Sequence, residues 1–539
     1  MQRRGAEQPV EYTDRSRLIG NTRNKKSSNQ PIEENEERVK TSGRWWQEVR
    51  PYNVYVLLLL LLAYLLNQLD RYMLPVTVLP VAQEIKFGDK GCLRNASVHS
   101  SSSIKCNGTD HDSCLEIQDA ERNKLCFWDY NGQGWDYLIL AGPVFILIYT
   151  FAGIFIGFAA DHYNRKMFLA FCLAFWSAMT LLTGFVKEYW QLAVLRFGLG
   201  LGEAGCTPFA SSLITEYFSQ SLRGTALGIY NFGVYFGYSL SFAVGNFITL
   251  ANINGQSWRW AFIISGIPGI VLGAVIAFSV REPDRMNNKS AQQKQELEDS
   301  ITTPQQRLAL LSIQIRLKTV LKVFLRPSLL LLCLAGSIRN AAGYVLAYNS
   351  QLYFETTNVS KEMVGSYMSW IPLVGGSIGA LGGGFISDRV VRKWGLYARV
   401  SVLVASQLLA APFAAGVLFL NAPYAFFSLI PTYIIGEMWI SVTLTVAVEL
   451  VPSQVRTSAV AVYLFIITNI GGNLPLLVPP IAASFESRGY NQVDALRGAL
   501  YILYPGLFVL GGLLFLLTMF VVKRDQQRAQ YEVVTMEDP

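Results

Sequence analysis

Long apolar segments recur along the chain, and they constrain its fold more than any other feature. Residues 144–160 and 501–522, for example, contain no charged side chain. A helix of about 20 such residues is long enough to cross a bilayer. Twelve segments of this kind occur, at about 53–78, 137–160, 166–187, 190–214, 224–250, 259–280, 327–353, 361–387, 398–421, 423–449, 456–483 and 498–522. The sequence therefore predicts an all-α polytopic membrane protein with 12 transmembrane helices.

The composition excludes several other classes of protein. Hydrophobic residues make up 51% of the chain and charged residues 15%, against about 25% charged residues in soluble domains. A soluble enzyme and a disordered scaffold are therefore excluded. The net charge of +7 does not indicate a nucleic-acid partner, because the basic residues lie at the ends of apolar segments, as the positive-inside rule predicts.

The membrane segments contain no set of side chains suited to catalysis or to metal binding. The chain has only three histidines, and no nucleophile–histidine pair or metal-ligand cluster stands in these segments. We therefore expect no enzyme activity, no catalytic residues, no bound metal and no cofactor other than a proton acting as coupling ion.

A polar stretch divides the apolar segments into six and six. An even number places both termini on one side of the membrane, and the basic short loops mark that side as cytosolic. Residues 305–325 alternate apolar and basic side chains at helical spacing, which predicts either a helix on the membrane surface or a plain linker helix. The predicted parts are a disordered cytosolic N-tail (1–50), an N-terminal six-helix bundle (51–281), a cytosolic linker (282–326), a C-terminal six-helix bundle (327–523) and a cytosolic C-tail (524–539).

The long loop at 84–136 faces the opposite, lumenal side and is rich in cysteine. Four of the seven cysteines lie in it: Cys92, Cys106, Cys114 and Cys126. Such clustering favours two disulfide bonds in an oxidising compartment, with three pairings possible. A zinc site is the weaker alternative, because the spacing lacks a close cysteine pair.

Three glycosylation sequons fall on this lumenal side, at Asn95, Asn107 and Asn358. A fourth sequon, at Asn288, lies in the predicted cytosolic linker and should remain unmodified. The sequence therefore predicts a glycoprotein whose modified sites all lie on one side of the membrane.

Two loop motifs repeat between the halves on the cytosolic side. Gly157, Asp161, Arg165 and Lys166 recur 227 residues later as Gly384, Asp388, Arg392 and Lys393. Glu216 and Arg223 recur 233 residues later as Glu449 and Arg456. Both copies lie on the same side, so the repeat is parallel, which is a transporter design. We expect the loop acids to bridge to a helix terminus or to an arginine of the other half, and Glu216 with Arg223 and Glu449 with Arg456 to be partners, in gating ion pairs that exchange as the halves rock. The alternative is that the loop only fixes the topology.

The repeated loop resembles the signature of the major facilitator superfamily over about residues 53–523. Within it, the chain is most similar to the Spinster-like transporters of lysolipids and sphingolipids. That similarity is carried by residues 67–72, 161–166, 196–204, 258–261 and 281–283. The resemblance implies that the first, fourth, seventh and tenth helices line a central cavity, and that the charged positions matching the family couple protons or substrate.

Charged side chains within membrane segments are expensive and usually functional. Six occur here: Asp70, Arg71, Arg196, Glu203, Arg339 and Glu437. At the rise of a helix, Asp70 and Arg196 lie at similar depth and are expected to pair. The arginines suit an anionic head group and the carboxyl groups suit a proton. The alternative is a set of structural ion pairs.

We therefore predict a proton-coupled, alternating-access transporter of an amphiphilic anionic lipid, such as a lysophospholipid or sphingosine phosphate, out of the lysosome. The alternatives are a transporter of a small organic anion or sugar acid, and a membrane receptor or sensor with a transporter fold. The expected partners are the substrate, membrane lipids and sorting adaptors, and the protein is expected to be a monomer.

Two short tail motifs bear on the compartment. They resemble acidic dileucine and tyrosine-based sorting signals and consist of Asp14, Leu18 and Ile19, and of Tyr531 and Val534. These motifs favour the lysosomal or late endosomal membrane, with the plasma membrane as the alternative.

Overall fold

The computed structural model describes residues 50–88, 90–94, 111–116, 126–132, 134–162, 164–219, 222–283, 322–451 and 456–537. Residues 51–539 form one unit of the chain, separate from the N-tail. The sorting motif at Asp14, Leu18 and Ile19 and nearly all of the predicted surface helix lie outside the described residues. Tyr531 and Val534 fall in the last turns of the final helix, and their side chains are not described.

The N-terminal half follows the six predicted apolar segments. Its helices are α1 (Pro51–Ile85), α3 (Gly134–Ala141), α4 (Pro143–His162), α5 (Arg165–Thr183), α6 (Tyr189–Glu203), α7 (Cys206–Tyr217), α8 (Arg223–Ala251), η2 (Ile253–Gly255) and α9 (Trp258–Ser279).

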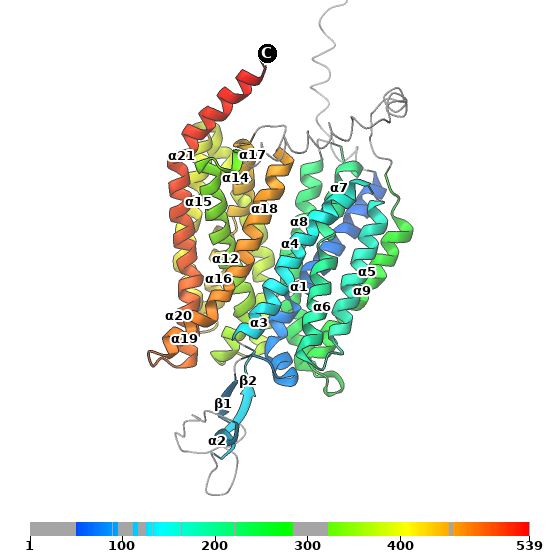
Figure 1. Cartoon of the computed structure of the whole chain (residues 1–539), viewed down its shortest axis with the longest axis vertical. Coiled ribbons are helices and arrows are strands. Elements are labelled where there is room, and N and C mark those ends of the chain that lie inside the picture. Colours follow the sequence, from blue (N-terminus) through cyan, green and yellow to red (C-terminus); the bar gives the residue numbers. More distant parts are fainter. Residues whose placement is uncertain are drawn as a thin grey trace, which may run out of the picture. The chain divides into compact units, whose positions relative to one another are not determined.

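The C-terminal half repeats this pattern. Its helices are α12 (Pro327–Thr356), α13 (Lys361–Met368), η3 (Pro372–Gly376), α14 (Ser377–Trp394), α15 (Leu396–Phe419), α16 (Tyr424–Gly436), α17 (Trp439–Glu449), α18 (Arg456–Asn473), η5 (Leu474–Leu477), α19 (Val478–Glu486), α20 (Gln492–Leu503) and α21 (Pro505–Glu537). Figure 1 shows the two halves as neighbouring groups of helices.

Among the described residues, eleven helical stretches are long and apolar enough to cross a membrane. The twelfth predicted segment is present as α6 and α7, which follow one another but are separated by a break at Ala204 and Gly205. The corresponding segment of the other half is broken at the equivalent place, between α16 and α17. The predicted twelve-helix fold is therefore confirmed. A Gly-Glu pair lies at each break: Gly202 and Glu203 end α6, whereas Gly436 ends α16 and Glu437 lies in the break itself.

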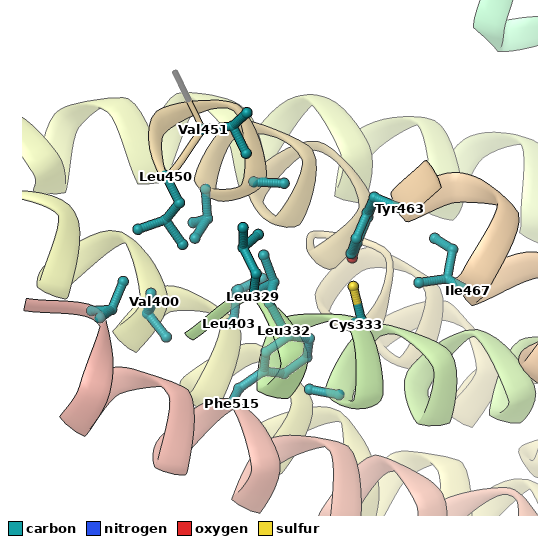
Figure 2. Close-up of a cluster of buried hydrophobic side chains, with 14 of the residues drawn as sticks. Leu329, Leu332, Cys333, Val400, Leu403, Leu450, Val451, Tyr463, Ile467 and Phe515 are labelled. Carbon is teal, nitrogen blue, oxygen red and sulfur yellow. The ribbon is translucent and has the colours of Figure 1, made fainter. Parts of the chain in front are cut away.

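Close helix packing within each half fixes the backbone around the charged residues. In the N-terminal half, α1 packs along α8, and a Cβ atom added at Gly237 would lie 2.3 Å from the carbonyl oxygen of Leu65. Only glycine permits this approach. In the C-terminal half, a buried cluster that includes Leu329, Val400 and Phe515 joins α12, α15, α17, α18 and α21 (Figure 2).

The cysteine-rich loop forms a small cap at one end of the N-terminal half (Figure 1). Strands β1 (Lys90–Arg94) and β2 (Cys126–Tyr130) pair antiparallel, and the short helix α2 (His111–Leu115) packs against β2. The otherwise all-α fold thus contains one two-stranded sheet. Cys92 is disulfide-bonded to Cys114, and Cys126 is also disulfide-bonded. Cys106 and the sequons Asn95, Asn107 and Asn288 lie outside the described residues.

The disulfide bond makes a direct prediction for peptide mapping. Digestion of the unreduced protein is expected to yield one linked species that contains Cys92 and Cys114, because their Cα atoms are 5.5 Å apart in the folded cap. Mass spectrometry before and after reduction checks this. Buried Cys172, Cys206 and Cys333 are free and provide the internal control. Free, alkylated Cys92 in native protein would contradict the prediction.

Candidate functional site

The centre of the N-terminal half contains a buried ion pair between α1 and α6. Arg71 Nε and Nη2 donate to the same oxygen of Glu203, at 3.1 and 3.0 Å. The Glu203 side chain is fully buried and that of Arg71 is 7% exposed. Glu203 is the last residue of α6, directly before the break, so the interruption in the helix positions its carboxylate toward α1.

Arg196 has a different role from the one its depth predicted. Its Nη2 donates to the carbonyl oxygen of Arg71 at 2.9 Å, and its Nη1 reaches that of Asp70 at 3.5 Å. In a regular helix the Arg71 carbonyl would accept from residue 75, but that residue is Pro75, which has no N–H. Arg196 supplies the missing donor. The expected pairing of Arg196 with the Asp70 carboxylate is therefore wrong, because proline redirects the guanidinium to the backbone.

We predict that Arg196→Ala destabilises the protein by about 1.5–3 kcal/mol, because a buried carbonyl loses a charged donor. Pro75→Ala would restore a backbone N–H at the same carbonyl. The loss caused by Arg196→Ala is therefore expected to be smaller in a Pro75→Ala background, as thermal unfolding in detergent can measure. Equal losses in both backgrounds would show that Arg196 does not act through this carbonyl.

The carboxylate of Asp70 stands apart from this network. Its two oxygens are buried and accept no hydrogen bond that meets geometric criteria within the described part of the chain. The side chains of Trp176 and Thr180 of α5 are donors within hydrogen-bonding reach of this carboxylate, and Glu203 and Arg196 lie within electrostatic reach. Neither donor is charged, and a buried carboxylate with no cation in contact is costly, so Asp70 gains from a new partner.

The C-terminal half contains a second pair that mirrors the first. Arg339 of α12 donates through Nη2 to Glu437 Oε1 and to the Gly436 carbonyl oxygen, both at 3.0 Å. Glu437 follows the end of α16, as Glu203 ends α6. The Glu437 side chain is 17% exposed, which makes it the most accessible of the four paired groups. Each half thus contains an arginine–glutamate pair whose glutamate follows a glycine at a helix break, Gly202-Glu203 in one half and Gly436-Glu437 in the other.

Aromatic side chains surround both pairs. The Arg71 guanidinium lies 4.4 Å from the centre of the Tyr149 ring and 5.0 Å from that of Phe145. Tyr344, from the other half, lies beside Arg71, and the Tyr235 hydroxyl donates to Glu437 across the halves at 3.4 Å. The charges of each half are therefore in contact with aromatic residues that include side chains from the opposite half. These tyrosines could not be predicted from the sequence, because their spacing is the same as that of residues that only pack helices together.

The repeated loop motifs form ionic networks at the opposite end of the bundle from the disulfide cap. Arg165 donates through Nε to Glu282 at 2.8 Å and through Nη1 to Glu216 at 3.3 Å. The backbone N–H of Lys166 also donates to Glu282. Arg223 donates to the Phe218 carbonyl instead, so the expected Glu216–Arg223 pair is not the one formed: Arg165 lies closer to Glu216.

The C-terminal half builds its network with a residue that the sequence analysis missed. Arg399 of α15 donates to Asp388 at 2.9 Å and lies 3.2 Å from Glu449. The motif residues Arg392 and Lys393 are exposed at the end of α14. Arg399 was overlooked because it lies at the very start of an apolar segment. It is adjacent to Val400, so the buried cluster of Figure 2 holds it in place.

For most of the remaining motif residues, the structure describes the backbone position only. Gly157 and Asp161 lie in α4, and Arg456 begins α18, but their side chains are not described. Gly384 lies in α14. The expected Glu449–Arg456 pair therefore stays a prediction, while Glu449 is within reach of Arg399.

Comparison with known proteins decides the family. The sequence profile of the Major Facilitator Superfamily matches residues 60–474. The chain belongs to this superfamily. Its members are transporters, which confirms that the protein is not an enzyme.

Spinster proteins are among its relatives, as the sequence resemblance predicted. Protein spinster homolog 1 of Xenopus laevis is 26% identical over 417 residues, which cover 72% of this chain and 75% of that protein. The sphingosine-1-phosphate transporter SPNS2 of Danio rerio is 31% identical over 148 residues, or 27% of this chain and 29% of that protein. The chain is thus similar to Spinster proteins over most of its length and to the sphingosine-1-phosphate transporter over about a quarter of it.

Solved structures agree on the fold. A bacterial homolog of the human lysosomal transporter Spinster, in an inward-facing and unoccupied conformation, superposes with a TM-score of 0.63 at 22% identity. The match covers 89% of this chain and 98% of the bacterial one. At this identity the likeness supports the superfamily fold and nothing finer.

Proposed function

We propose that the protein is a proton-coupled, alternating-access transporter of an amphiphilic anionic lipid such as a lysophospholipid or sphingosine phosphate. The observation that carries this proposal is the buried cluster of Arg71, Glu203 and Asp70. The Glu203 carboxylate holds the Arg71 guanidinium and lies within electrostatic reach of the buried Asp70 carboxylate, so a proton bound at either carboxyl group changes the charge beside Arg71.

The proposed cycle exchanges the partners of Arg71. When a proton binds the cluster, one carboxyl group becomes neutral and attracts Arg71 less, so the guanidinium is released to an anionic head group. Phosphate suits the forked geometry of arginine. Loss of the proton reverses the exchange. Tyr149 and Tyr344 offer apolar ring surface beside the guanidinium for the first carbons of a lipid tail.

The state of the two ionic networks supports alternating access. Among the described residues, the hydrogen bonds that cross between the halves lie at mid-depth or toward the disulfide cap, for example Thr150 to Asn469 and Tyr137 to the Tyr348 carbonyl. The Arg165 and Arg399 networks each stay within one half. The halves are thus joined on the cap side, which corresponds to a state that opens on the motif side.

Reconstitution tests the substrate. Purified protein in liposomes is expected to take up labelled lysophospholipid or sphingosine phosphate faster under a pH gradient than without one. A labelled sugar acid serves as the competing substrate. Uptake of the sugar acid with no uptake of either lipid would overturn the lipid proposal. Lipid uptake at the same rate with and without the pH gradient would overturn the proposal of proton coupling but not the proposal of a lipid substrate.

The proposed orientation places the cap in a lumen and the two ionic networks in the cytosol. We predict glycosylation at Asn358 and none at Asn288. Asn358 is exposed in the turn between α12 and α13, at the same end of α12 as Tyr348, whose carbonyl accepts from Tyr137 of α3 just after the cap. Glycosidase treatment of Asn358→Gln and Asn288→Gln variants checks this, since each loss of a glycan changes gel mobility. A shift caused by Asn288→Gln would reverse the orientation.

The proposed orientation also bears on the cellular compartment of the protein. A disulfide-bonded cap requires an oxidising side, and we propose the lysosomal or late endosomal membrane, with delivery through adaptors that recognise the tails. Imaging of the full chain against a chain with Leu18→Ala and Ile19→Ala tests this. Unchanged lysosomal localisation of that variant would exclude the dileucine motif as the signal.

A further inference from the structure

Two buried amide side chains join the halves on the cap side, apart from the charged site. Asn246 lies near the end of α8 and Gln351 near the end of α12. Asn246 Nδ2 donates to Gln351 Oε1 at 3.0 Å, and Gln351 Nε2 donates back to Asn246 Oδ1 at 2.8 Å. The two residues are 1% and 2% exposed. This reciprocal pair spans the interface between the two bundles.

The second N–H of each amide also has a partner, and this fixes how the pair is oriented. Asn246 donates to the Phe242 carbonyl at 3.1 Å, and Gln351 donates to Glu355 Oε1 at 2.7 Å. All four amide N–H groups are thus used. Exchanging oxygen and nitrogen in either amide would place two acceptors or two donors face to face. The full set of hydrogen bonds therefore exists only when the halves are together.

Helix α13 closes tightly over the same place. A Cβ atom added at Gly365 would lie 3.0 Å from Asn246 Cβ, so α13 and α8 approach as closely as glycine allows. Glu355, which accepts from Gln351, lies 3.7 Å from the Lys361 ammonium at the start of α13. The amide pair is therefore surrounded by α8, α12 and α13, the elements that must separate if the bundle opens on this side.

We propose that the Asn246–Gln351 pair is the latch that closes the transporter on the cap side, and that Glu355 is a positioning residue that orients the Gln351 amide. Neutral amides suit this task. They form a specific contact when buried, yet water replaces their hydrogen bonds when the halves part, so the latch can reopen. A buried ion pair would leave two uncompensated charges instead.

Distances between spin labels test the latch without any substrate, so the result does not depend on the lipid proposal. Labels are attached through Gln256→Cys and Glu362→Cys, which are exposed on the cap side of the two halves. The free native cysteines are buried. Asn246→Ala and Gln351→Ala are each expected to raise the ratio of long-distance to short-distance populations roughly tenfold. The double variant is expected to shift it no further than the stronger single one, because both remove the same contact.

Matched variants separate the latch from a general loss of packing. Asn349→Ala removes a buried amide of the same helix whose Nδ2 donates, within the described residues, to the carbonyl of Val345 one turn earlier, and it should leave the distances unchanged. Glu355→Ala should shift them toward the open state, while Glu355→Gln, which keeps an acceptor, should not. Gly365→Ala adds a methyl group between α13 and α8 and should therefore open the same side. This variant replaces Asn246→Ala in the test if Asn246→Ala does not fold.

Two results would overturn the latch. The first is a wild-type distance distribution in both Gln351→Ala and Gly365→Ala. The second is a double variant whose shift equals the sum of the single shifts, because two independent contacts would then be involved.

Discussion

Replacing Arg71 with alanine is expected to lower lipid uptake at least a hundredfold and to destabilise the protein. Glu203 would be left buried and charged with no cation in contact, which typically costs about 3–5 kcal/mol. Arg71 is also the cation that we propose to contact the head group. Uptake into proteoliposomes and thermal unfolding in detergent measure the two effects separately.

A double variant distinguishes the two roles of Arg71. Arg71→Ala with Glu203→Gln removes both charges, so most of the stability should return while transport stays absent. Arg488→Ala, at an exposed arginine in the turn after α19, should change neither quantity. If Arg71→Ala transports lipid at the wild-type rate, Arg71 is structural, and the head group must bind near Arg339 and Glu437.

Much of the fold was predictable because each membrane segment carries its own signal. A bilayer requires about 20 apolar residues in one helix, so the twelve segments can be read without knowing their neighbours. The break between α6 and α7 was not predicted, because local composition does not show that a helix is interrupted after Glu203. Its counterpart at Glu437, between α16 and α17, indicates that the break is a feature of the repeat.

The membership of the charged cluster was predictable, but its pairings were not. Depth along a helix predicted that Asp70 and Arg196 pair. In the structure Arg196 instead donates to the backbone carbonyl left free by Pro75, and rotation about the helix axis brings Arg71, not Asp70, into contact with Glu203. Arg399 and the Asn246–Gln351 pair were missed for a related reason. A polar residue at a segment end is ordinary in sequence, and only the neighbouring helix shows what it contacts.

Asp70→Asn and Glu203→Gln are expected to leave the protein folded and able to bind substrate, but to remove the dependence of net transport on pH. Each amide has nearly the shape of the protonated carboxyl group and cannot release a proton. Asp70 accepts no well-aligned hydrogen bond among the described residues, and an amide oxygen can still face the neutral donors Trp176 and Thr180, so Asp70→Asn should cost little stability. Glu203→Gln should weaken the interaction of residue 203 with the Arg71 guanidinium. Substrate binding measured in detergent should therefore be retained or increased.

The measurement is uptake across imposed pH gradients, with binding determined separately in detergent. In the wild type, uptake should change at least tenfold between the extremes of the gradient, and in the two variants the curve should be flat. Glu486→Gln, at an exposed carboxylate on the cap side, is the matched control and should keep the wild-type curve. Wild-type pH dependence in both site variants would mean that these acids are structural. The coupling group would then be sought at Glu437 of the second pair, which is more exposed than Glu203 of the first.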